Sequence, residues 1–557
     1  MTRSVIDPIT RIEGHLRVEM EVQNGKVADA WVSGGCFRGM ELVVQGRTPE
    51  DAAQIVERIC GVCPVSHAHA SSIAGEKAYG ITISNNARII RNLLEGAQFL
   101  HSNILWMYNL AALDYVNPLN ALTANVADAI DLAQAAGTSM HSDLGALHKK
   151  LAAFAKNGQL SIFSGNWFEA DEGTAYKMTP EADLICTAHY LEALKMQARA
   201  SEVSALLGGK MPHVMTSVPG GTMWVPTEQK LDDLKAMVDE IYNWVAETML
   251  PDTMVLATYY PNVLEFGKGC GRYIAWGVFE GPGWPYGDNY IDQMKNRYLP
   301  MAVLDEQFKV SDVEESLIDE YMGRSWYKGT ETYQSPYFVT EPDFTEYDVN
   351  DRYTWVKCPT YDGKPMEAGS MARIFAAYQR KVPFIVENVD KLLVALGAKP
   401  GDLTAFQSTL GRTAIRQIET LYVAGLMREW VTELMEALAS GDSEYFREPK
   451  TITGEGTGFW EAPRGALYHS EKVKDGKIEG YQIIIPSTWN LAPINGAGDH
   501  GPLEQALIGV PVEDIEMPIN ALRTVHSFDP CTACAVHVSE PATGKHFETV
   551  TSPWGVK

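Results

Sequence analysis

Apolar and polar residues alternate in two short regions near the ends of the chain. Residues 15–33 alternate around an Asn-Gly dipeptide, and residues 467–485 alternate around an Asp-Gly dipeptide. Both dipeptides favour the two-residue turn that joins antiparallel strands, because they adopt positive φ readily. The pattern therefore predicts one β-hairpin near each end of the chain.

Between these hairpins the apolar positions recur every three to four residues, which indicates helices packed on a core. The first helix begins at Thr48 and Pro49, a capping residue and a first-turn proline, and would place Cys60 at its C-terminal end. Longer helical patterns cover residues 85–113, 183–207, 227–247 and 402–439. Residues 265–360 are rich in Gly, Pro, Trp and Tyr, so irregular segments and short strands are expected there.

These patterns predict an α+β fold that is predominantly α-helical. Its core would be a bundle of long helices, and both ends of the chain would contribute small antiparallel β-hairpins. At 557 residues the chain exceeds the size at which one hydrophobic core stops growing. No repeat, low-complexity tract or clean linker divides it. We therefore expect one compact body rather than separable domains.

The charge and the apolar runs exclude several classes of partner. A formal charge of −25 repels phosphate backbones and anionic lipid, so nucleic acid is not expected as a partner. The most apolar segment, residues 99–116, is interrupted by polar residues and is interpreted as a buried helix. Residues 1–10 have no apolar run behind a basic start, so export would need a partner's signal.

Four of the eight cysteines form two C-x-x-C pairs at opposite ends of the chain. Cys60 and Cys63 are followed by His67, and Cys531 and Cys534 are followed by a histidine three residues on. Two thiolates at this spacing bind one soft metal such as zinc, nickel or iron. A single pair is more often structural zinc or a redox pair, but zinc ribbons separate their pairs by about 15–20 residues. Here more than 460 residues intervene, which favours a metal held in the middle of a large protein.

Several sequence blocks together resemble the large subunit of nickel-iron hydrogenases. They lie in the family's order and span nearly the whole chain. The blocks are RIEGHLRVE at 11–19, R-x-C-G-x-C-x-x-x-H at 58–67, PHVMTSVPGG at 212–221, EAPRGAL at 461–467, PSTWN at 486–490 and DPCTACAVH at 529–537. The resemblance implies reversible heterolytic cleavage of dihydrogen to protons and electrons, with hydrogen uptake as the favoured direction.

The resemblance implies a nickel-iron centre held by the four paired cysteines. Cys60 and Cys531 would bind nickel terminally, and Cys63 and Cys534 would bridge nickel to an iron that carries one carbon monoxide and two cyanides. Soft thiolates suit this centre because they stabilise several nickel oxidation states.

Residues around the centre would orient its ligands. The resemblance implies that Arg464 donates to one cyanide and polarises arriving dihydrogen, that Ser487 donates to the other, and that Asp529 fixes Arg464. Pro463 would lie beside the cofactor, and His67 would hydrogen-bond near a bridging thiolate. Without the resemblance, Arg464 would be interpreted as a salt-bridge or surface arginine, Ser487 as a turn residue and Asp529 as a cap or turn former.

Dihydrogen cleavage also needs a base for the proton. The resemblance assigns the first proton step to a terminal thiolate, here Cys531, and the next to Glu13. From the residues alone, Glu13 would be a salt-bridge partner of the neighbouring arginine. A second metal site is implied by Glu41, His537 and the backbone oxygen of Ile483, where a magnesium ion or a similar divalent cation would bind. Alone, Glu41 would be a solvated acid and His537 a residue of a C-terminal helix.

The resemblance also implies processing and partners. Residues 1–537 would form the single hydrogenase domain, and an endopeptidase would remove residues 538–557 after metal-insertion chaperones have delivered nickel. This chain has no spare clustered cysteines for an iron-sulfur cluster, so an iron-sulfur small subunit would carry the electrons in a heterodimer or higher oligomer. Co-export with that subunit would make the protein periplasmic or membrane-associated, with a possible membrane cytochrome b; otherwise it would be cytoplasmic.

Two departures and two rival functions stand beside this prediction. Ser102 follows His101 where many relatives have an acid, so one carboxylate near Arg464 is missing. The PSTWN block continues as LAPINGAGDHG, whereas relatives commonly have glycine-proline-arginine there. One rival is a hydrogen sensor that signals through a kinase; such sensors lack the cleaved tail. The other is a zinc-binding or metal-storage scaffold, which elemental analysis would identify.

Overall fold

The computed structural model describes residues 2–35, 37–161, 175–281, 290–329, 332–334 and 341–532. Its helices are α1 (Met40–Val43), α2 (Pro49–Ile55), α3 (Pro64–Tyr79), α4 (Asn85–Leu105), α5 (Val126–Ala136), α6 (Leu144–Lys156), α7 (Pro180–Gly208), α8 (Glu228–Trp244), α9 (Leu250–Tyr259), α10 (Tyr290–Lys295), α11 (Ser370–Gln379), α12 (Pro383–Ala395), α13 (Thr409–Ala439), α14 (Pro486–Asn490), α15 (Pro502–Leu507) and α16 (Ile519–Ser527). Its strands are β1 (Thr2–Ile6), β2 (Leu16–Gln23), β3 (Lys26–Gly34), β4 (Ser217–Val218), β5 (Gly221–Thr222), β6 (Tyr273–Ala275), β7 (Ala302–Leu304), β8 (Val310–Ser311), β9 (Ile318–Tyr321), β10 (Tyr327–Lys328), β11 (Thr332–Gln334), β12 (Glu341–Pro342), β13 (Cys358–Tyr361), β14 (Gly454–Ala462), β15 (Gly465–Lys474) and β16 (Lys477–Ile484).

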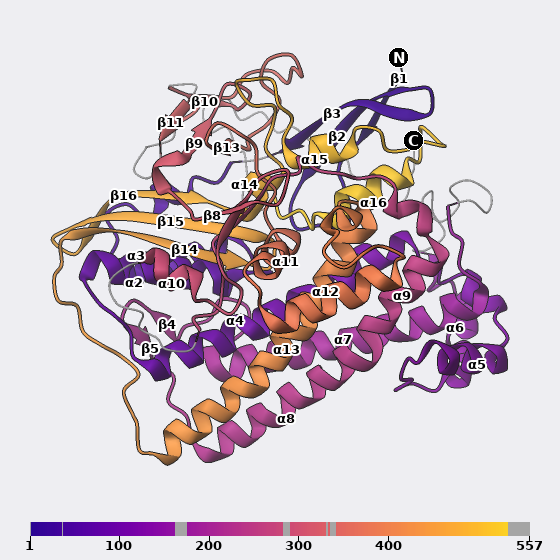
Figure 1. The fold of residues 1–557 in the computed structure, drawn as a ribbon, viewed down its shortest axis with the longest axis horizontal. Coiled ribbons are helices and arrows are strands. Elements are labelled where there is room, and N and C mark those ends of the chain that lie inside the picture. Colours follow the sequence, from indigo (N-terminus) through magenta and orange to yellow (C-terminus); the bar gives the residue numbers. More distant parts are fainter. Residues whose placement is uncertain are drawn as a thin grey trace.

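The long helices pack against one another on one side of the molecule. Figure 1 shows α7, α8 and α13 running side by side, and α4 packs against both α7 and α13. Helix α13 begins at residue 409 rather than at 402, because residues 403–406 form a separate 3₁₀ turn and Ser408 then caps the helix. An α+β fold in which helices predominate is confirmed, whereas the long bundle stays a prediction.

Both predicted β-hairpins are present, and each gains a third strand. Strands β2 and β3 pair across the Asn-Gly turn, and β1 adds to the outer edge of β2. Strands β15 and β16 pair across the Asp-Gly turn, and β14 adds to β15. In both turns the two central residues have positive φ, which is the conformation that their dipeptides favour.

Helix α3 lies directly on strand β14, because every second residue in the first half of the strand is a glycine, and these glycines share the face that contacts the helix. A Cβ atom built on Gly454, Gly456 or Gly458 would come within 2.3 Å of a helix carbonyl oxygen. Those carbonyls belong to Ala78, Ala74 and Ala70, which are spaced one helical turn apart. Backbone therefore packs on backbone, and this contact fixes the helix that follows Cys63.

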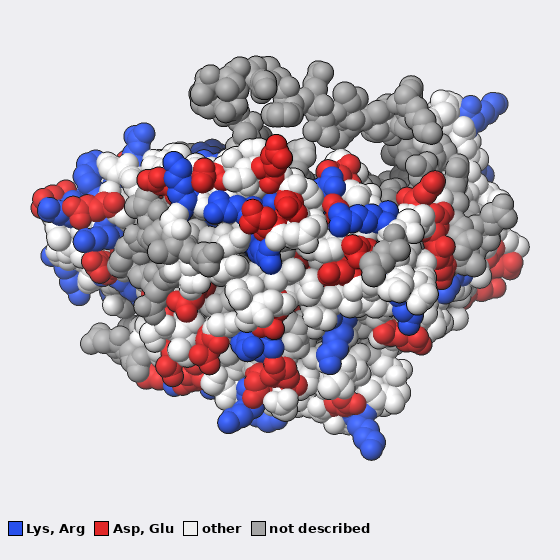
Figure 2. Space-filling model, turned by 90° about the horizontal axis from the view of Figure 1, so that it is seen from above, with Lys and Arg blue, Asp and Glu red and all other residues white. Residues whose placement is uncertain are grey.

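The surface carries both signs of charge. On the face shown in Figure 2, acidic and basic side chains of the described residues are interspersed. Among the described residues, no helix has the length and hydropathy that crossing a membrane requires.

Candidate metal centre

Three of the four paired cysteines converge in the interior. Cys60 follows a 3₁₀ turn (Val56–Ile59) that continues helix α2, Cys63 is the N-cap of α3, and Cys531 lies just beyond α16. Their sulfurs all lie within 4.8 Å of one another, and the Cys60 and Cys531 sulfurs are 3.4 Å apart. All three side chains are buried. Cys534, the fourth cysteine, lies outside the described residues.

The C-x-x-C turn points both of its sulfurs inward while its middle touches solvent. The Cys60 sulfur accepts hydrogen bonds from the backbone N–H groups of Val62 and Cys63, at 3.3 and 3.2 Å. Gly61 is exposed, and nothing lies within 4 Å of the position that its Cβ would take. The turn therefore has an exposed residue between two cysteines whose side chains are buried.

The N-terminal and C-terminal regions are joined beside these sulfurs. The backbone of Glu13 forms a parallel bridge with Cys531, in which Thr532 N–H donates to the Glu13 carbonyl at 2.7 Å. The Cys531 thiol donates to Glu13 Oε2 at 3.3 Å. A proton on this sulfur therefore has a carboxylate within direct reach.

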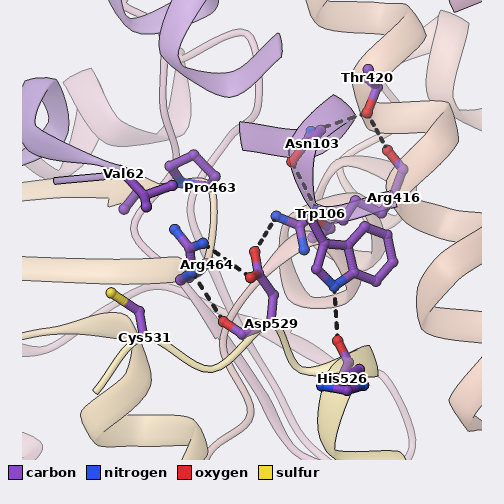
Figure 3. A network of polar contacts seen from close by, with 12 residues as sticks. Val62, Asn103, Trp106, Arg416, Thr420, Pro463, Arg464, His526, Asp529 and Cys531 are labelled. Carbon is purple, nitrogen blue, oxygen red and sulfur yellow. Dashed lines mark hydrogen bonds and ion pairs between the residues drawn. The ribbon is translucent and has the colours of Figure 1, made fainter. Parts of the chain in front are cut away.

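A buried ion-pair network lies on another side of Cys531 (Figure 3). Arg464 lies in the turn between β14 and β15 and binds Asp529 twice. Its Nη2 donates to the carboxylate Oδ1 and its Nε donates to the backbone oxygen, both at 3.0 Å. Arg416 of α13 donates to the other carboxylate oxygen at 2.7 Å. Asp529 has a positive φ of 51°, which turns the chain between α16 and Cys531.

One donor of Arg464 has no partner among the described residues. Its Nη1 is buried and makes no hydrogen bond there, although burial makes an unpaired charged donor costly. Burial lowers the pKa of Arg464, but Asp529 and the Cys531 and Cys63 thiols outweigh burial and raise it well above its ordinary value. An unpaired cationic donor beside three clustered sulfurs fits a thiolate-bound metal centre with small polar ligands.

Ser487 and Pro463 also lie at this site. The Ser487 hydroxyl accepts a hydrogen bond from the Cys531 backbone N–H at 3.1 Å, so its own proton is directed elsewhere. Pro463 is buried in the turn before Arg464, and its carbonyl accepts from Arg373 Nη2 at 2.8 Å.

His67 begins a buried chain of hydrogen bonds. Its Nδ1 is 3.1 Å from His469 Nε2, the other nitrogen of His469 bonds Tyr481 at 2.8 Å, and Tyr481 donates to Ser71. Burial lowers the pKa of His67 to about 4 against the opposing effect of Cys60, so His67 is neutral at pH 7. The contact to His469 uses the Nδ1 atom, which leaves Nε2 as the atom for any bond toward the sulfurs.

The predicted magnesium site is described in part. Glu41 Oε1 accepts from the Ile483 backbone N–H at 3.2 Å, and Lys357 Nζ lies 3.8 Å from the same oxygen. Burial raises the pKa of Glu41, and Lys357 opposes that rise. A cavity of about 90 Å³ extends from Glu41 to Cys531. His537 lies outside the described residues.

Two arginines near the centre were missed in the sequence. Arg373 is fully buried and donates to Glu419, Glu461 and the carbonyl of Ala462, so it supports the turn that carries Arg464. Arg416 reaches Asp529 across more than 100 residues. Both lie in helical sequence with no local motif, so only the fold brings them to the site.

Outside the sulfur cluster, Cys186, Cys270 and Cys358 are free thiols, which agrees with the expectation that no disulfide framework holds the described residues together.

Comparison with known proteins places this chain in a family. A family model described as nickel-dependent hydrogenase matches residues 38–537, and a second model, described as HoxL-like, matches residues 3–33. The chain is 36% identical to the hydrogenase-2 large chain of Escherichia coli K12, with 96% of this chain and 97% of that protein covered. It is 37% identical to the periplasmic [NiFeSe] hydrogenase large subunit of Desulfomicrobium baculatum, with 97% and 96% covered.

Solved structures agree with these relatives. The structure is similar to that of the H2-activated [NiFeSe] hydrogenase of Dm. baculatum, with a TM-score of 0.77 and 36% identity, covering 96% of this chain and all of that one. The uptake hydrogenase large subunit of Rhizobium leguminosarum is 35% identical, with 97% of this chain and 96% of that protein covered. With one family model spanning residues 38–537 and relatives aligned over nearly its whole length, the chain belongs to the nickel-dependent hydrogenases, as a catalytic large subunit.

Proposed function

We propose that Cys60, Cys63, Cys531 and Cys534 hold a nickel-iron centre at which dihydrogen is cleaved, with Glu13 receiving the released proton. The observation that carries this proposal is the convergence of three sulfurs from the two ends of the chain, with a carboxylate oxygen 3.3 Å from one of them. Each dihydrogen consumed yields two protons and two electrons.

When bound, the nickel-iron centre supplies an electrophile that polarises dihydrogen and accepts its electrons. The protein residues hold it in place and move the proton. Cys531 Sγ takes up the proton, and Glu13 Oε2 takes it from the sulfur, because the two atoms are already in hydrogen-bond contact. The backbone bridge between the same two residues keeps this distance fixed.

Arg464 would point its unpaired Nη1 toward the ligands of the iron, where a fixed positive charge stabilises negative charge on a cyanide. Asp529 holds the guanidinium in this orientation by accepting from Nη2 and Nε. The Ser487 hydroxyl would donate to the second cyanide, because its oxygen already accepts from Cys531 N–H. The assignment of carbon monoxide and cyanide as ligands of the iron rests on the family resemblance.

The cavity between Cys531 and Glu41 supports a second proposal about the C-terminal segment. We propose that residues 538–557 are removed on maturation and that a magnesium ion binds to Glu41, the Ile483 carbonyl and His537. The match of the family model ends at residue 537, which supports a mature end at this position. Metal-insertion chaperones would act before an endopeptidase removes the tail.

Electrons would leave a buried centre through a partner protein, and Gly61 is an exposed position directly between the two buried cysteines of the first pair. We propose that an iron-sulfur small subunit docks over Gly61. Met215 and Met223 flank the β4–β5 hairpin and are each 62% exposed, and an exposed methionine pair of this kind is suited to protein contact. Export with that subunit would place the enzyme in the periplasm or at the membrane, where a cytochrome b would accept electrons from the small subunit.

The decisive experiment is an infrared spectrum with elemental analysis of the purified protein. We expect carbonyl and cyanide stretching bands, with nickel and iron in equal amounts. Cys60→Ser and Cys531→Ser should abolish the bands, whereas Cys270→Ser, which removes a thiol that is not part of the sulfur cluster, should keep them. Zinc as the bound metal, without those bands, would contradict the proposal.

A further inference from the structure

The carboxylate that orients Arg464 is shared with a second arginine. Asp529 Oδ1 accepts from Arg464, and Oδ2 accepts from Arg416 Nη2 at 2.7 Å. All three side chains are at least 95% buried. Figure 3 shows the two guanidinium groups on either side of the carboxylate, with the Cys531 sulfur beyond Arg464.

Arg416 is itself held rigidly. Its Nε donates to Asn103 Oδ1 at 2.8 Å, and its guanidinium lies over the Trp106 ring, 4.3 Å from the centroid. Asn103 is fixed in turn by the Thr420 hydroxyl at 3.0 Å. The Trp106 indole donates to the His526 carbonyl at 2.8 Å. Helix α4, the turn after it, α13 and α16 thus all contribute to one orientation of Arg416.

This arrangement limits how Asp529 binds Arg464. An arginine and a carboxylate with both oxygens available commonly form a two-bond fork. Here Oδ2 is occupied by Arg416, so Arg464 reaches only Oδ1 and the backbone oxygen of Asp529. The Nη1 donor of Arg464 is left over, and it has no partner among the described residues.

Position 102 of α4, next to Asn103, carries no carboxylate that could bind Arg464 in place of Asp529. Ser102 is buried, and its hydroxyl has no partner in the described part of the chain. Burial lowers the pKa of Arg416, Asp529 opposes this, and Arg464 adds to the lowering, which reflects how close the two cations lie. Burying the Arg416 guanidinium beside a second cation costs free energy. We therefore expect its hydrogen bonds to stabilise either the site or the fold.

We propose that Arg416 is a positioning residue for the reaction: by taking one oxygen of Asp529 it keeps Arg464 Nη1 free and directed at the metal centre. The inference rests on the proposed function. Without Arg416, the released carboxylate oxygen would be available to Arg464, and Nη1 would turn toward it and away from the centre.

The test compares Arg416→Gln with the wild-type enzyme in its complete, metal-loaded complex. We expect nickel and iron to be retained, the cyanide stretching bands to shift, and kcat to fall about 10- to 100-fold, as happens when partners that orient a metal site's surroundings are removed. The KM for dihydrogen should stay unchanged, because Arg416 would act through Asp529 and Arg464 rather than on dihydrogen itself.

Two further variants separate positioning from general damage. Arg297→Gln removes an equally buried arginine that pairs with Glu280, away from Asp529, and should leave the cyanide bands in place. Asn103→Ala keeps every charge but frees Arg416 Nε, and should shift the bands in the same direction as Arg416→Gln. If Arg416→Gln does not retain nickel, the infrared spectrum of Asn103→Ala decides whether Arg416 positions Arg464.

If Arg416→Gln keeps its nickel and its cyanide bands do not shift, the inference is overturned. If Arg416→Gln loses nickel, unshifted cyanide bands in Asn103→Ala overturn it instead. An equal shift in Arg297→Gln would overturn it as well. Absence of carbonyl and cyanide bands from the wild-type protein is a different result, because it would refute the proposed function itself.

Discussion

Glu57 shows how far burial changes the chemistry of a single carboxyl group. The side chain is fully buried in the 3₁₀ turn that leads to Cys60, and neither oxygen accepts a hydrogen bond from a described residue. The Arg58 guanidinium lies 4.0 Å away and is half exposed. Burial raises the pKa of Glu57 to about 9, and Arg58 only partly opposes this. Glu57 is therefore protonated in the folded protein at neutral pH.

This pKa predicts a pH-dependent gain in stability for Glu57→Gln. The folded pKa lies above that of the unfolded chain, so the wild-type protein loses stability as pH rises from about 4.5 to 9, by roughly 1.4 kcal/mol per pH unit as an upper limit. Glutamine does not ionise, so the free energy of unfolding of the variant, relative to that of the wild type, should rise across this pH range. Urea unfolding at pH 5 and pH 8 measures the difference.

The exposed Glu448→Gln is the control for Glu57→Gln, because its side chain faces solvent. Its unfolding free energy should follow that of the wild type at both pH values. A gain for Glu57→Gln that is the same at pH 5 and at pH 8 would contradict the assigned cause.

Glu13→Gln tests the proton step. The amide keeps the size of the side chain and the backbone bridge to Cys531, so the metal should still bind. It cannot take up a proton, so kcat for dihydrogen oxidation should fall about 10²- to 10⁴-fold. Glu21→Gln, a partly exposed glutamate of strand β2, serves as the control. Undiminished oxidation by Glu13→Gln would exclude this residue as the proton acceptor.

At the scale of helices and strands, the sequence correctly predicted the elements that short local patterns determine. Asn-Gly and Asp-Gly located both hairpins, and the capping residue Thr48 located the helix before Cys60, where its hydroxyl accepts from Asp51 N–H. Strand β14 was missed, because alternate glycines replace the apolar positions that mark a buried strand face. Its partner there is helix α3, and such a long-range contact leaves no periodic signal.

The contact between α3 and β14 predicts the effect of a single methyl group. In Gly458→Ala the new Cβ would lie 1.9 Å from the Ala70 carbonyl oxygen, so the helix must move away. We expect a loss of about 1–3 kcal/mol in the free energy of unfolding, and a lower nickel content because α3 begins next to Cys63. Denaturant unfolding and elemental analysis measure the two effects.

Gly425→Ala in α13 is the matched control, since its Cβ would meet only Tyr242 at 3.9 Å, an ordinary contact. Alanine favours a helix over glycine by up to about 1 kcal/mol, so this variant should be neutral or stabilised. Equal stability of Gly458→Ala and the wild type would show that the two backbones separate without cost.

At the scale of the whole molecule, the residues of the candidate site fall into two groups. One group is marked by a local sequence motif, and the other reaches the site only through contacts between distant parts of the chain. The paired cysteines carry a short local motif, and the family resemblance joined their two halves across the chain. Arg373 and Arg416 carry none, because each is a helical residue whose partner lies far along the sequence. Such contacts depend on how α11 and α13 pack, which a periodic pattern does not specify.

The exposed methionines predict how the electron-transfer partner binds. Met215→Asp together with Met223→Asp places two charges on the proposed docking surface and should weaken association with the small subunit. Dihydrogen oxidation through that partner would fall, while hydrogen–deuterium exchange at the centre, which needs no electron transfer, would persist. Val394→Asp, at an equally exposed valine of α12, is the control. Unchanged association of the double variant would place the interface elsewhere.

The bridge between Glu13 and Cys531 has a consequence for biosynthesis. A ribosome must add more than 460 residues after the first C-x-x-C pair before it reaches the third sulfur, so the growing chain offers only that first pair for most of its synthesis. Nickel that arrived during this time would meet an incomplete set of donors. Stable insertion of nickel must therefore follow the synthesis of Cys531.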